Sequence, residues 1–379
     1  MRRRDFLKLG SGIGASLLLA SCELVRPPTR SPIVATARSL LHAGERLGTA
    51  DDAPILSRCA QRLANTGLIT ARPVVLDLEG LTYRTVSSFR VHDFGDFTLG
   101  SGATPGTLRT TSDFGPPGTD SRTRAHVIFT NGFHATVAPR FSILGPHSDA
   151  EPNRSLNGQF EQQCGAWFQS VVAVDFVDVD VQNVWGDFCD FGAADPRNPV
   201  DCQRAHVVPG IWRRNGRVGL LAHCNGLRFE GGPRTRIDRC VGDLYHIELS
   251  SDQQSAGFGS HTISNLHVHD TKFFAHLAGM HFFHDFAILN CSRDDGPVDV
   301  QLTTYNNNPA KRFRYERNHW SVSGGRVLNL SNVQGVTIRY NAGPLQPNQT
   351  VAHSLDLNNC TDVVHADNAF TLNGVRINY

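Results

Sequence analysis

The chain has 379 residues, of which 40% are apolar, 19% are charged and 8% are aromatic. Its 36 Lys and Arg residues are balanced by 35 Asp and Glu residues. This composition excludes a disordered polyelectrolyte and a basic nucleic-acid-binding domain, so we expect a large soluble globular body and no nucleic-acid partner.

Residues 1–21 have the features of an export signal. The segment Arg3-Arg4-Asp5-Phe6-Leu7-Lys8 precedes an apolar run from Leu9 to Ala20, and it resembles the twin-arginine pattern of proteins that are exported already folded. Leu19-Ala20-Ser21-Cys22 resembles a bacterial lipobox, whose cysteine is lipidated after cleavage. The apolar run is far shorter than the roughly 20 residues that span a bilayer, which argues against a transmembrane anchor. The prediction is an exported lipoprotein, held to a membrane through a lipid on Cys22, in the periplasm or at the cell surface.

Removing residues 1–21 takes away four basic groups and one acidic group, which leaves 32 against 34 and a net charge of −2. Recognition of a charged partner must then be local. Beyond Cys22 the chain has eight more cysteines, and their spacing leaves open whether they form disulfides or are small buried residues. These cysteines are Cys59, Cys164, Cys189, Cys202, Cys224, Cys240, Cys291 and Cys360.

Residues 22–48 are predicted to be a tether, because the stretch Arg26-Pro27-Pro28-Thr29-Arg30-Ser31-Pro32 is too polar and too broken to pack. The folded body is expected over 49–379 as one domain. Thr49-Ala50-Asp51-Asp52 offers N-caps for an amphipathic helix that ends near Gly67. The apolar positions with helical spacing are Ile55, Leu56, Cys59, Leu63 and Leu68.

Beyond this helix the apolar period changes to two. Strands are predicted at 74–78, 89–94 and 97–99, and residues 100–122, rich in Gly, Pro, Ser and Thr, are predicted to be a loop. No second helix of comparable quality follows in the sequence.

An imperfect repeat begins near residue 171. Gly186, Gly216 and Gly242 mark a recurring corner at spacings of 30 and 26 residues, and the segment 328–333 is echoed 27 residues later at 355–360. Short strands with Asn, Gly and Asp at their corners and this period are typical of a β-solenoid, in which the many phenylalanines would form internal stacks. A β-sandwich is the alternative, but it predicts hairpins with Asn-Gly or Asp-Gly turns.

These repeats resemble the right-handed parallel β-helix superfamily that contains pectate lyases, polygalacturonases and phage tailspike proteins. The opening is similar too, since Asp51-Asp52-Ala53-Pro54-Ile55-Leu56 followed by the segment 75–83 is like the capping helix and first coil of many members. The resemblance implies an all-β fold, a single-stranded right-handed parallel β-helix over 49–379 with a short N-terminal capping helix, and action on or binding to polysaccharide.

The catalytic motifs of polygalacturonases are not matched. Gly186-Asp187-Phe188 has Phe in place of the second Asp of G-D-D, Gly216-Arg217-Val218-Gly219 lacks the His of G-H-G, and Arg236-Ile237-Asp238 has Asp in place of the Lys of R-I-K. The D-P-H-D motif of alginate epimerases and a compact Asp cluster of the lyase calcium type are also absent from the sequence. These departures argue against polygalacturonase activity as such.

A strip of polar residues along one corner is the candidate site. If the corners align, Asp187 and Asp243 lie two coils apart, roughly 9–10 Å, with Arg217 between them, near the upper end of the ~6.5–9.5 Å that separates the carboxylates of an inverting glycosidase. Asp270 and Asp294 or Asp295 would continue the row. Alternation along the strands turns Asp190, His246 and Glu248 outward.

The strip predicts a polysaccharide hydrolase or lyase. The candidate catalytic residues are Asp187, Asp190, Asp243, His246 and Glu248, and the candidate substrate-binding residues are Arg217, Trp185 and Trp212. The alternative is a non-catalytic carbohydrate-binding or structural solenoid, because Asp and Arg at corners also stabilise a solenoid edge. Six histidines are concentrated between residues 261 and 284: His261, His267, His269, His276, His281 and His284. His267 and His269 share a strand face and could begin a metal site, but no Cys or acidic partner at diagnostic spacing completes it, so we expect no metal and no cofactor.

Overall fold

The computed structural model describes residues 30–111, 125–147, 163–192, 202–248, 259–278, 284–303, 309–348 and 350–379. The chain divides into the units Met1–Ser31 and Pro32–Tyr379, and the second unit contains all the helices and strands described below. The predicted signal and Cys22 lie outside the described residues.

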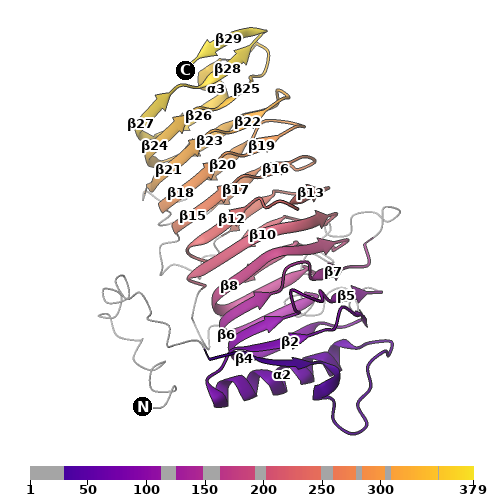
Figure 1. The fold of residues 1–379 in the computed structure, drawn as a ribbon. Helices are drawn as coiled ribbons and strands as arrows, with labels where there is room; N and C mark the ends of the chain where they lie inside the picture. Colours follow the sequence, from indigo (N-terminus) through magenta and orange to yellow (C-terminus); the bar gives the residue numbers. More distant parts are fainter. Residues whose placement is uncertain are drawn as a thin grey trace, which may run out of the picture. The chain divides into compact units, whose positions relative to one another are not determined.

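The described residues from 32 onwards form a parallel β-helix, as predicted (Figure 1). Strands pair with those of the next coil rather than with their sequence neighbours, and this produces three parallel sheets. The predicted echo between 328–333 and 355–360 is one such pairing, because Leu328 lies beside Leu355. The period of the repeat therefore corresponds to one coil.

The first sheet contains β1 (Ile33–Thr36), β2 (Val74–Asp77), β12 (Leu227–Glu230), β15 (Gly259–Ser264), β18 (His284–Leu289), β21 (Ala310–Glu316), β24 (Val333–Arg339) and β27 (Thr361–Ala366). The second contains β3 (Thr82–Thr85), β5 (Thr107–Thr110), β7 (Ser142–Leu144), β13 (Arg236–Asp238), β16 (His267–Val268), β19 (Ser292–Arg293), β22 (His319–Trp320), β25 (Ala342–Pro344) and β28 (Ala369–Leu372), with β29 (Val375–Asn378) antiparallel to β28.

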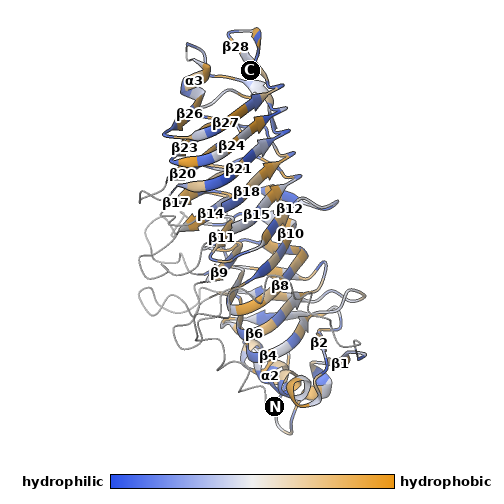
Figure 2. Ribbon diagram, turned by 90° about the vertical axis from the view of Figure 1, so that its left-hand side faces the viewer, coloured by the Kyte–Doolittle hydropathy of each residue, from blue (hydrophilic) through white to orange (hydrophobic). Residues whose placement is uncertain are grey.

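The third sheet contains β9 (Cys189–Gly192), β11 (Leu220–Ala222), β14 (Tyr245–Glu248), β17 (Ala275–Ala278), β20 (Val300–Thr303), β23 (Leu328–Ser331) and β26 (Leu355–Asn358). These strands are stacked in order in Figure 2. Four long strands bend from one sheet into another: β4 (Phe89–Leu99), β6 (Val127–Val137), β8 (Ala166–Gln182) and β10 (Arg204–Arg213).

A left-handed residue recurs once per coil where the first sheet turns into the second. Asn265, Asn290 and Arg317 have φ values of 56°, 57° and 57°, a conformation in which Asn is enriched. The residue after it points inward, and in the last coils that residue is Asn. The Asn341 backbone N–H donates to Asn368 Oδ1 at 3.0 Å, and the Asn318 backbone N–H donates to Asn341 Oδ1 at 2.9 Å. This ladder satisfies the backbone at the corner.

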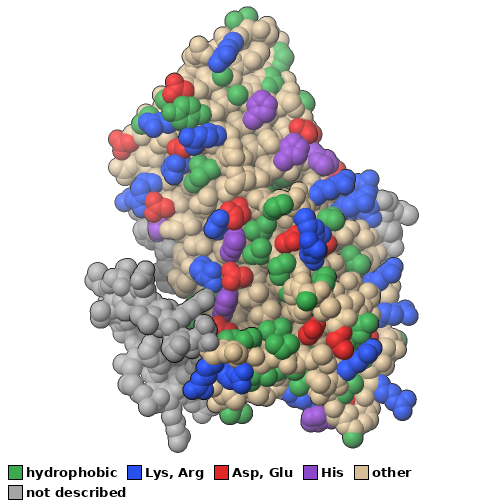
Figure 3. Space-filling view, viewed as in Figure 1, with side chains coloured by type: hydrophobic (Ala, Val, Ile, Leu, Met, Phe, Trp, Pro, Cys, Tyr) green, Lys and Arg blue, Asp and Glu red, His purple; other side chains and the backbone are tan. Residues whose placement is uncertain are grey.

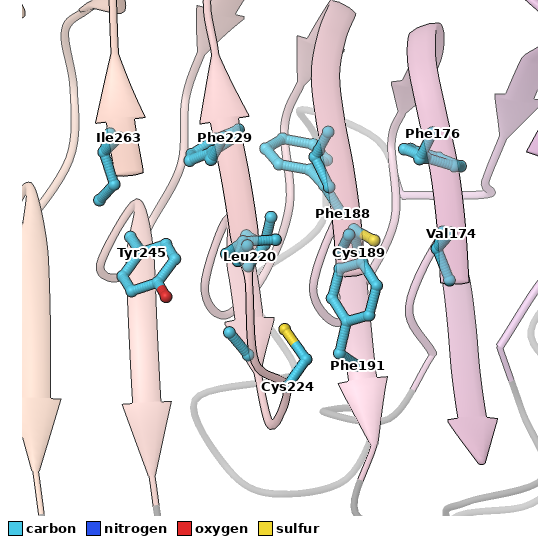
Figure 4. Packing of buried hydrophobic residues seen from close by; sticks show 14 of the residues in the cluster. Val174, Phe176, Phe188, Cys189, Phe191, Leu220, Cys224, Phe229, Tyr245 and Ile263 are labelled. Carbon is cyan, nitrogen blue, oxygen red and sulfur yellow. The ribbon is translucent and has the colours of Figure 1, made fainter. Parts of the chain in front are cut away.

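Aromatic rings stack along the core (Figure 4). Phe168 lies between Phe129 and Phe191, with ring centroids 5.3 and 5.4 Å apart. Such stacks follow from register, because each coil presents its inward residue to the same position of the next. All eight cysteines from Cys59 to Cys360 are thiols, and seven of them are buried. The interpretation as small buried residues therefore holds for those seven, while Cys360 is half-buried.

The N-terminal helix α2 (Ala53–Thr70) packs against β2 and β4 at the first coils (Figure 1). Leu56, Cys59 and Leu63 are buried, as their spacing predicted. A second, short helix, α3 (Val351–Ser354), and the 3-10 helix η3 (Arg38–Leu40) complete the helical elements of the described residues.

The predicted tether over 22–48 is wrong for its second half. Ile33–Thr36 forms β1, which pairs in parallel with β2, and the Ile33 N–H donates to Pro73 O at 2.9 Å. The alternation Ile-Val-Ala-Thr is too short to stand out beside the preceding prolines, so tertiary pairing decides its conformation. The predicted loop over 100–122 likewise contains a strand, β5, which pairs with β3 and β7.

Candidate active site

Two histidines and one aspartate meet on the outward face of the third sheet. In β14, Tyr245 and Ile247 are fully buried, so the alternation of the strand turns His246 outward. His276 holds the same position in β17, and the register pairs it with His246. Asp243 lies at the corner just before β14. The sequence Asp243-Leu244-Tyr245-His246 therefore brings a carboxylate and an imidazole together, and the next coil adds the second imidazole.

The Asp243 carboxylate accepts a hydrogen bond from each imidazole. Its Oδ2 lies 2.8 Å from His246 Nδ1 and 3.1 Å from His276 Nδ1. The two ring centroids are 4.9 Å apart and the rings cross at 87°. Asp243 is 6% exposed, whereas the side chains of His246 and His276 are 14% and 25% exposed. The carboxylate is covered and the imidazoles reach the surface.

Asp243 is held in its ionised form. Burial alone would raise the pKa of its carboxyl group, but the hydrogen bonds from His246 and His276 outweigh burial and lower the pKa to about 2. An ionised carboxylate only accepts hydrogen bonds, so each Nδ1 carries a proton. Each ring then has Nε2 as its second, chemically distinct nitrogen, which is the arrangement by which an aspartate orients a histidine for proton transfer.

The second oxygen of Asp243 is also distinctive. Oδ1 is buried, and among the described residues no hydrogen-bond donor reaches it. Buried carboxylate oxygens are usually satisfied. The three side chains offer one oxygen and two nitrogens within 4.8 Å of one another, a set of atoms suited to a metal ion. His267 and His269, the two histidines that share a strand face in the sequence, have separate acidic partners, Asp294 and Asp238.

Asp187 is near Asp243 along the corner, as predicted, but it is fully buried. Its Oδ1 accepts from the Val218 N–H at 3.0 Å, and its Oδ2 lies 3.2 Å from an Arg217 guanidinium nitrogen. With none of its surface exposed, Asp187 cannot contact a polysaccharide. The prediction that Asp187 is catalytic is therefore wrong. Its hydrogen bonds instead hold the corner between β9 and β11 in place.

The predicted row of charges is shifted by one residue. Leu220 pairs with both Cys189 and Tyr245, so Val218, two residues before Leu220, is the partner of Asp187 and Asp243. Tyr245 pairs with Ala275, so Phe273, two residues before Ala275, holds this position in the next coil. Arg217 is one residue earlier and reaches back to Asp187.

The other acids of the predicted row lie at the start of the corner, after the strands of the second sheet. Asp270 follows β16, and Asp294 and Asp295 follow β19. Asp295 pairs with the buried Arg293 at 2.7 Å, and Arg293 also binds Asp299. Asp295 and Asp299 thus hold the corner through Arg293, whereas Asp294 pairs with His267 on the second sheet.

Asp190 stands at the outward position of the third sheet that alternation predicts. Asp190 pairs with Leu221, and Leu221 pairs with His246 of the following coil. Even so, Asp190 is only 4% exposed. Its side chain therefore has little surface to offer a substrate. Glu248 ends β14, but its side chain lies outside the described residues.

The predicted sugar-stacking tryptophans are in the core. Trp212 is fully buried, with its ring 5.3 Å from that of Phe188, and its Nε1–H donates to Val179 O at 3.1 Å. Trp185 is fully buried too and stacks on His147 at 3.9 Å. Neither ring has a free face for a sugar, so the predicted substrate-binding role of Trp185 and Trp212 is wrong.

The backbones of two basic residues flank Gly242, the residue before Asp243. The backbone N–H of Lys272, on the following coil, donates to Gly242 O at 3.1 Å. Arg217, on the preceding coil, has its carbonyl oxygen 2.2 Å from where a Cβ of residue 242 would stand, so only glycine fits here. The Lys272 side chain is exposed, and its ammonium nitrogen lies 5.5 Å from the centroid of the Phe273 ring, which is itself 5.9 Å from the ring of His276.

Polar side chains continue from the imidazoles along the third sheet. In register after His276 come Gln301, Asn329 and Asp356, one per coil, so the column extends about 14 Å beyond His276. It ends at a shallow depression of about 590 Å³ whose lining includes Asn329, Asp356 and Arg326. Arg326 and Asp356 pair at 2.8 Å. The face thus offers hydrogen-bonding groups at regular spacing.

A second group of charges lies on the first sheet, where Figure 3 shows a column of acidic, basic and histidine side chains. His134 Nε2 is 2.8 Å from Asp175 Oδ2, and its Nδ1 is 3.4 Å from Asp96. Arg204 lies 3.2 Å from the other oxygen of Asp175. These groups neutralise one another across neighbouring coils, so we interpret them as a stabilising ladder.

This ladder predicts a stability that depends on pH. Burial opposes the charge on His134, but its hydrogen bonds with Asp175 and Asp96 outweigh burial and raise its pKa; the hydrogen bond from His134 in turn lowers the pKa of Asp175. The contribution of His134 is full below its unfolded pKa of about 6.5 and is lost as the pH rises through the folded value, while that of Asp175 is full above about 3.9 and is lost as the pH falls. We expect His134→Gln to cost about 1–2 kcal/mol near pH 5 and less at pH 8. Urea unfolding at both pH values measures this, with the exposed His319→Gln as control; an equal cost at both pH values would contradict it.

In the part of the chain that the structure describes, neither helix has the length and apolar character needed to cross a bilayer.

A scan against protein-family models finds no match to the chain, and a search of curated proteins finds none either. Among solved structures, a hyperthermoactive exopolygalacturonase from Thermotoga maritima is similar. The alignment covers 92% of this chain and 94% of that one, with 11% sequence identity and a TM-score of 0.46.

Proposed function

We propose that the protein cleaves an acidic polysaccharide on the outward face of the third sheet, with Asp243, His246 and His276 as its catalytic centre. The observation that carries this proposal is the single carboxylate oxygen shared by two imidazoles that reach the surface. Proton donors and acceptors at one place are the general requirement for cleaving a glycosidic bond. The buried Asp243 orients both rings, and His246 and His276 contact the substrate.

The residue types favour eliminative cleavage. Hydrolysis by the usual route needs two carboxylates that both reach the sugar, and Asp187 is buried. In elimination, one neutral imidazole removes the proton next to the uronic-acid carboxylate, and the other, protonated, donates to the departing glycosidic oxygen. The electron pair of the broken C–H bond forms the C=C bond of the product. Two imidazoles on one carboxylate are suited to hold these two states side by side.

The surroundings favour an anionic chain. The exposed Lys272 ammonium lies over the Phe273 ring, whose other neighbour is the His276 ring, and there it would pair with a uronic-acid carboxylate. The polar column Gln301, Asn329 and Asp356 runs on from His276 and would bind the hydroxyl groups of neighbouring sugars. An acidic polysaccharide lying along the third sheet satisfies both features.

The proposal is tested with a panel of uronic-acid and neutral polysaccharides. Reducing ends report any cleavage, and the ultraviolet absorbance of unsaturated products reports elimination. We expect both signals on a uronic-acid polysaccharide. Reducing ends without absorbance would mean hydrolysis, and binding without either signal would support the alternative, a non-catalytic carbohydrate-binding solenoid. That alternative is favoured by the ion pair of Asp187 with Arg217, which satisfies the corner without any ligand.

We also propose export through the twin-arginine segment and lipid attachment at Cys22, which would place the protein in the periplasm or at the cell surface. In a bacterial host, Cys22→Ser is expected to move the protein from the membrane fraction to the soluble periplasmic fraction, because one residue carries the lipid. Arg3→Lys with Arg4→Lys should leave it in the cytoplasm. Fractionation followed by immunoblotting measures both, with Cys59→Ser as control. An unchanged membrane fraction for Cys22→Ser would contradict lipid attachment.

A further inference from the structure

The geometry points to a metal-binding capacity of the same cluster: we propose that Asp243, His246 and His276 bind one divalent transition-metal ion of the zinc class. This inference does not rest on the proposed polysaccharide cleavage, because metal binding is measured without any substrate. It also departs from what the sequence predicts, since the ligands come from two coils and share no diagnostic spacing.

The donor atoms already converge. The ligand atoms of the three residues lie within 4.8 Å of one another, and Oδ2 is 2.8 and 3.1 Å from the two Nδ1 atoms. Zinc binds imidazole nitrogen and carboxylate oxygen at about 2.0–2.2 Å, which places the ligands of a tetrahedral site about 3.4 Å apart. To admit the ion, the two Oδ2–Nδ1 separations would lengthen by about 0.6 and 0.3 Å, and the two Nδ1 atoms, which lie within 4.8 Å of each other, would come to about 3.4 Å. Each ring would bind through Nδ1 and carry its proton on Nε2 instead.

The environment supplies a second reason. Asp243 is 6% exposed and its Oδ1 has no hydrogen-bond donor among the described residues, so the buried carboxylate has coordinating capacity left over. The guanidinium group of Arg217, on the preceding coil, already pairs with Asp187 at 3.2 Å. Lys272 is exposed to solvent, with its ammonium nitrogen over the Phe273 ring, so its repulsion of a bound ion is screened.

The donor set selects the kind of ion. Two imidazoles and one carboxylate suit zinc, copper, nickel or iron, whereas calcium and magnesium prefer oxygen ligands. Three protein ligands also leave a fourth tetrahedral position open, as in exchangeable and catalytic sites. The partial exposure of His246 and His276, 14% and 25%, gives an ion a route to the site.

The test uses tag-free protein that has been dialysed against a chelator and titrated with zinc by calorimetry. We expect one ion per chain, and a loss of affinity of at least about 10-fold in His276→Ala and in His246→Ala, since even second-shell changes cost 10–100-fold. His267→Ala is the matched control, because His267 also pairs with an aspartate, Asp294, but with no second imidazole; its affinity should equal that of the unmodified protein.

Thermal unfolding by circular dichroism establishes that each variant is folded. X-ray absorption at the zinc edge of the unmodified protein provides a measurement that needs no variant, and we expect scattering from two imidazole rings. The inference is overturned if no ion binds at one equivalent, if both His→Ala variants keep full affinity, or if the bound zinc shows no imidazole ligand.

Discussion

Replacing Asp243 with asparagine is expected to lower the rate of polysaccharide cleavage by about 10²–10⁴-fold while the fold is retained. The side chains have nearly the same shape, so packing at the corner is preserved. The amide has one accepting oxygen and no charge, however, and its NH₂ group can only donate. Its uncharged oxygen accepts the two imidazole hydrogen bonds more weakly than a carboxylate does, and it cannot stabilise an imidazolium.

The measurement is the initial rate on whichever polysaccharide the protein cleaves, compared at equal concentrations of folded protein. Asp294→Asn is the matched control, because Asp294 pairs with His267 at 3.1 Å on the second sheet, where both side chains are about 60% exposed. We expect its rate to be that of the unmodified protein. An equal rate for Asp243→Asn would show that the shared carboxylate takes no part in cleavage.

Replacing Trp212 with alanine is expected to lower the free energy of unfolding by about 3–5 kcal/mol. The ring is fully buried between Phe188 and Phe229, with centroid separations of 5.3 and 5.7 Å. Its loss also leaves Val179 O without the indole donor. The cavity would open at the centre of the stack that joins the β8, β9 and β10 coils.

Urea unfolding followed by circular dichroism measures this cost. Trp212→Phe should lose less, because it keeps an aromatic ring in the stack. Val322→Ala is the control, since Val322 is 45% exposed and surface changes of this kind are usually within about 0.5 kcal/mol. A Trp212→Ala protein that unfolds like the parent but no longer binds polysaccharide would instead mean that the ring is a ligand-binding surface.

Much of the fold follows from local pattern. The 27-residue echo of Leu328 at Leu355 marks one coil, and alternation in β14 predicts correctly that Tyr245 is buried and His246 faces outward. The strand Ile33–Thr36 is not predicted from local pattern, because its four residues form a strand only through their pairing with β2.

The site depends on register, and register is where the sequence is least informative. His276 lies 30 residues after His246, whereas the next coil advances by 25 from Ala275 to Val300, so no fixed period aligns the two histidines. The signal that was available is the pattern of a histidine between two apolar residues, Tyr245-His246-Ile247 and Ala275-His276-Leu277.

A slip of one residue explains the predicted charge row. Taking Gly216 as the partner of Gly186 and Gly242 puts Arg217 level with the two aspartates, but the observed register puts Val218 there. Burial is the other quantity that local pattern does not supply. Asp187 and Trp212 are polar or amphipathic residues next to corners, and only the packing of neighbouring coils shows that both are covered completely.

The central claim is that the outward face of the third sheet around Asp243 cleaves polysaccharide with His246 and His276. The most direct test is the rate of unsaturated-product formation from uronic-acid polysaccharides by the unmodified protein and by a folded His246→Ala/His276→Ala double variant. We predict turnover of at least one such polysaccharide by the unmodified protein and none by the double variant. Turnover that survives the loss of both imidazoles would contradict the claim.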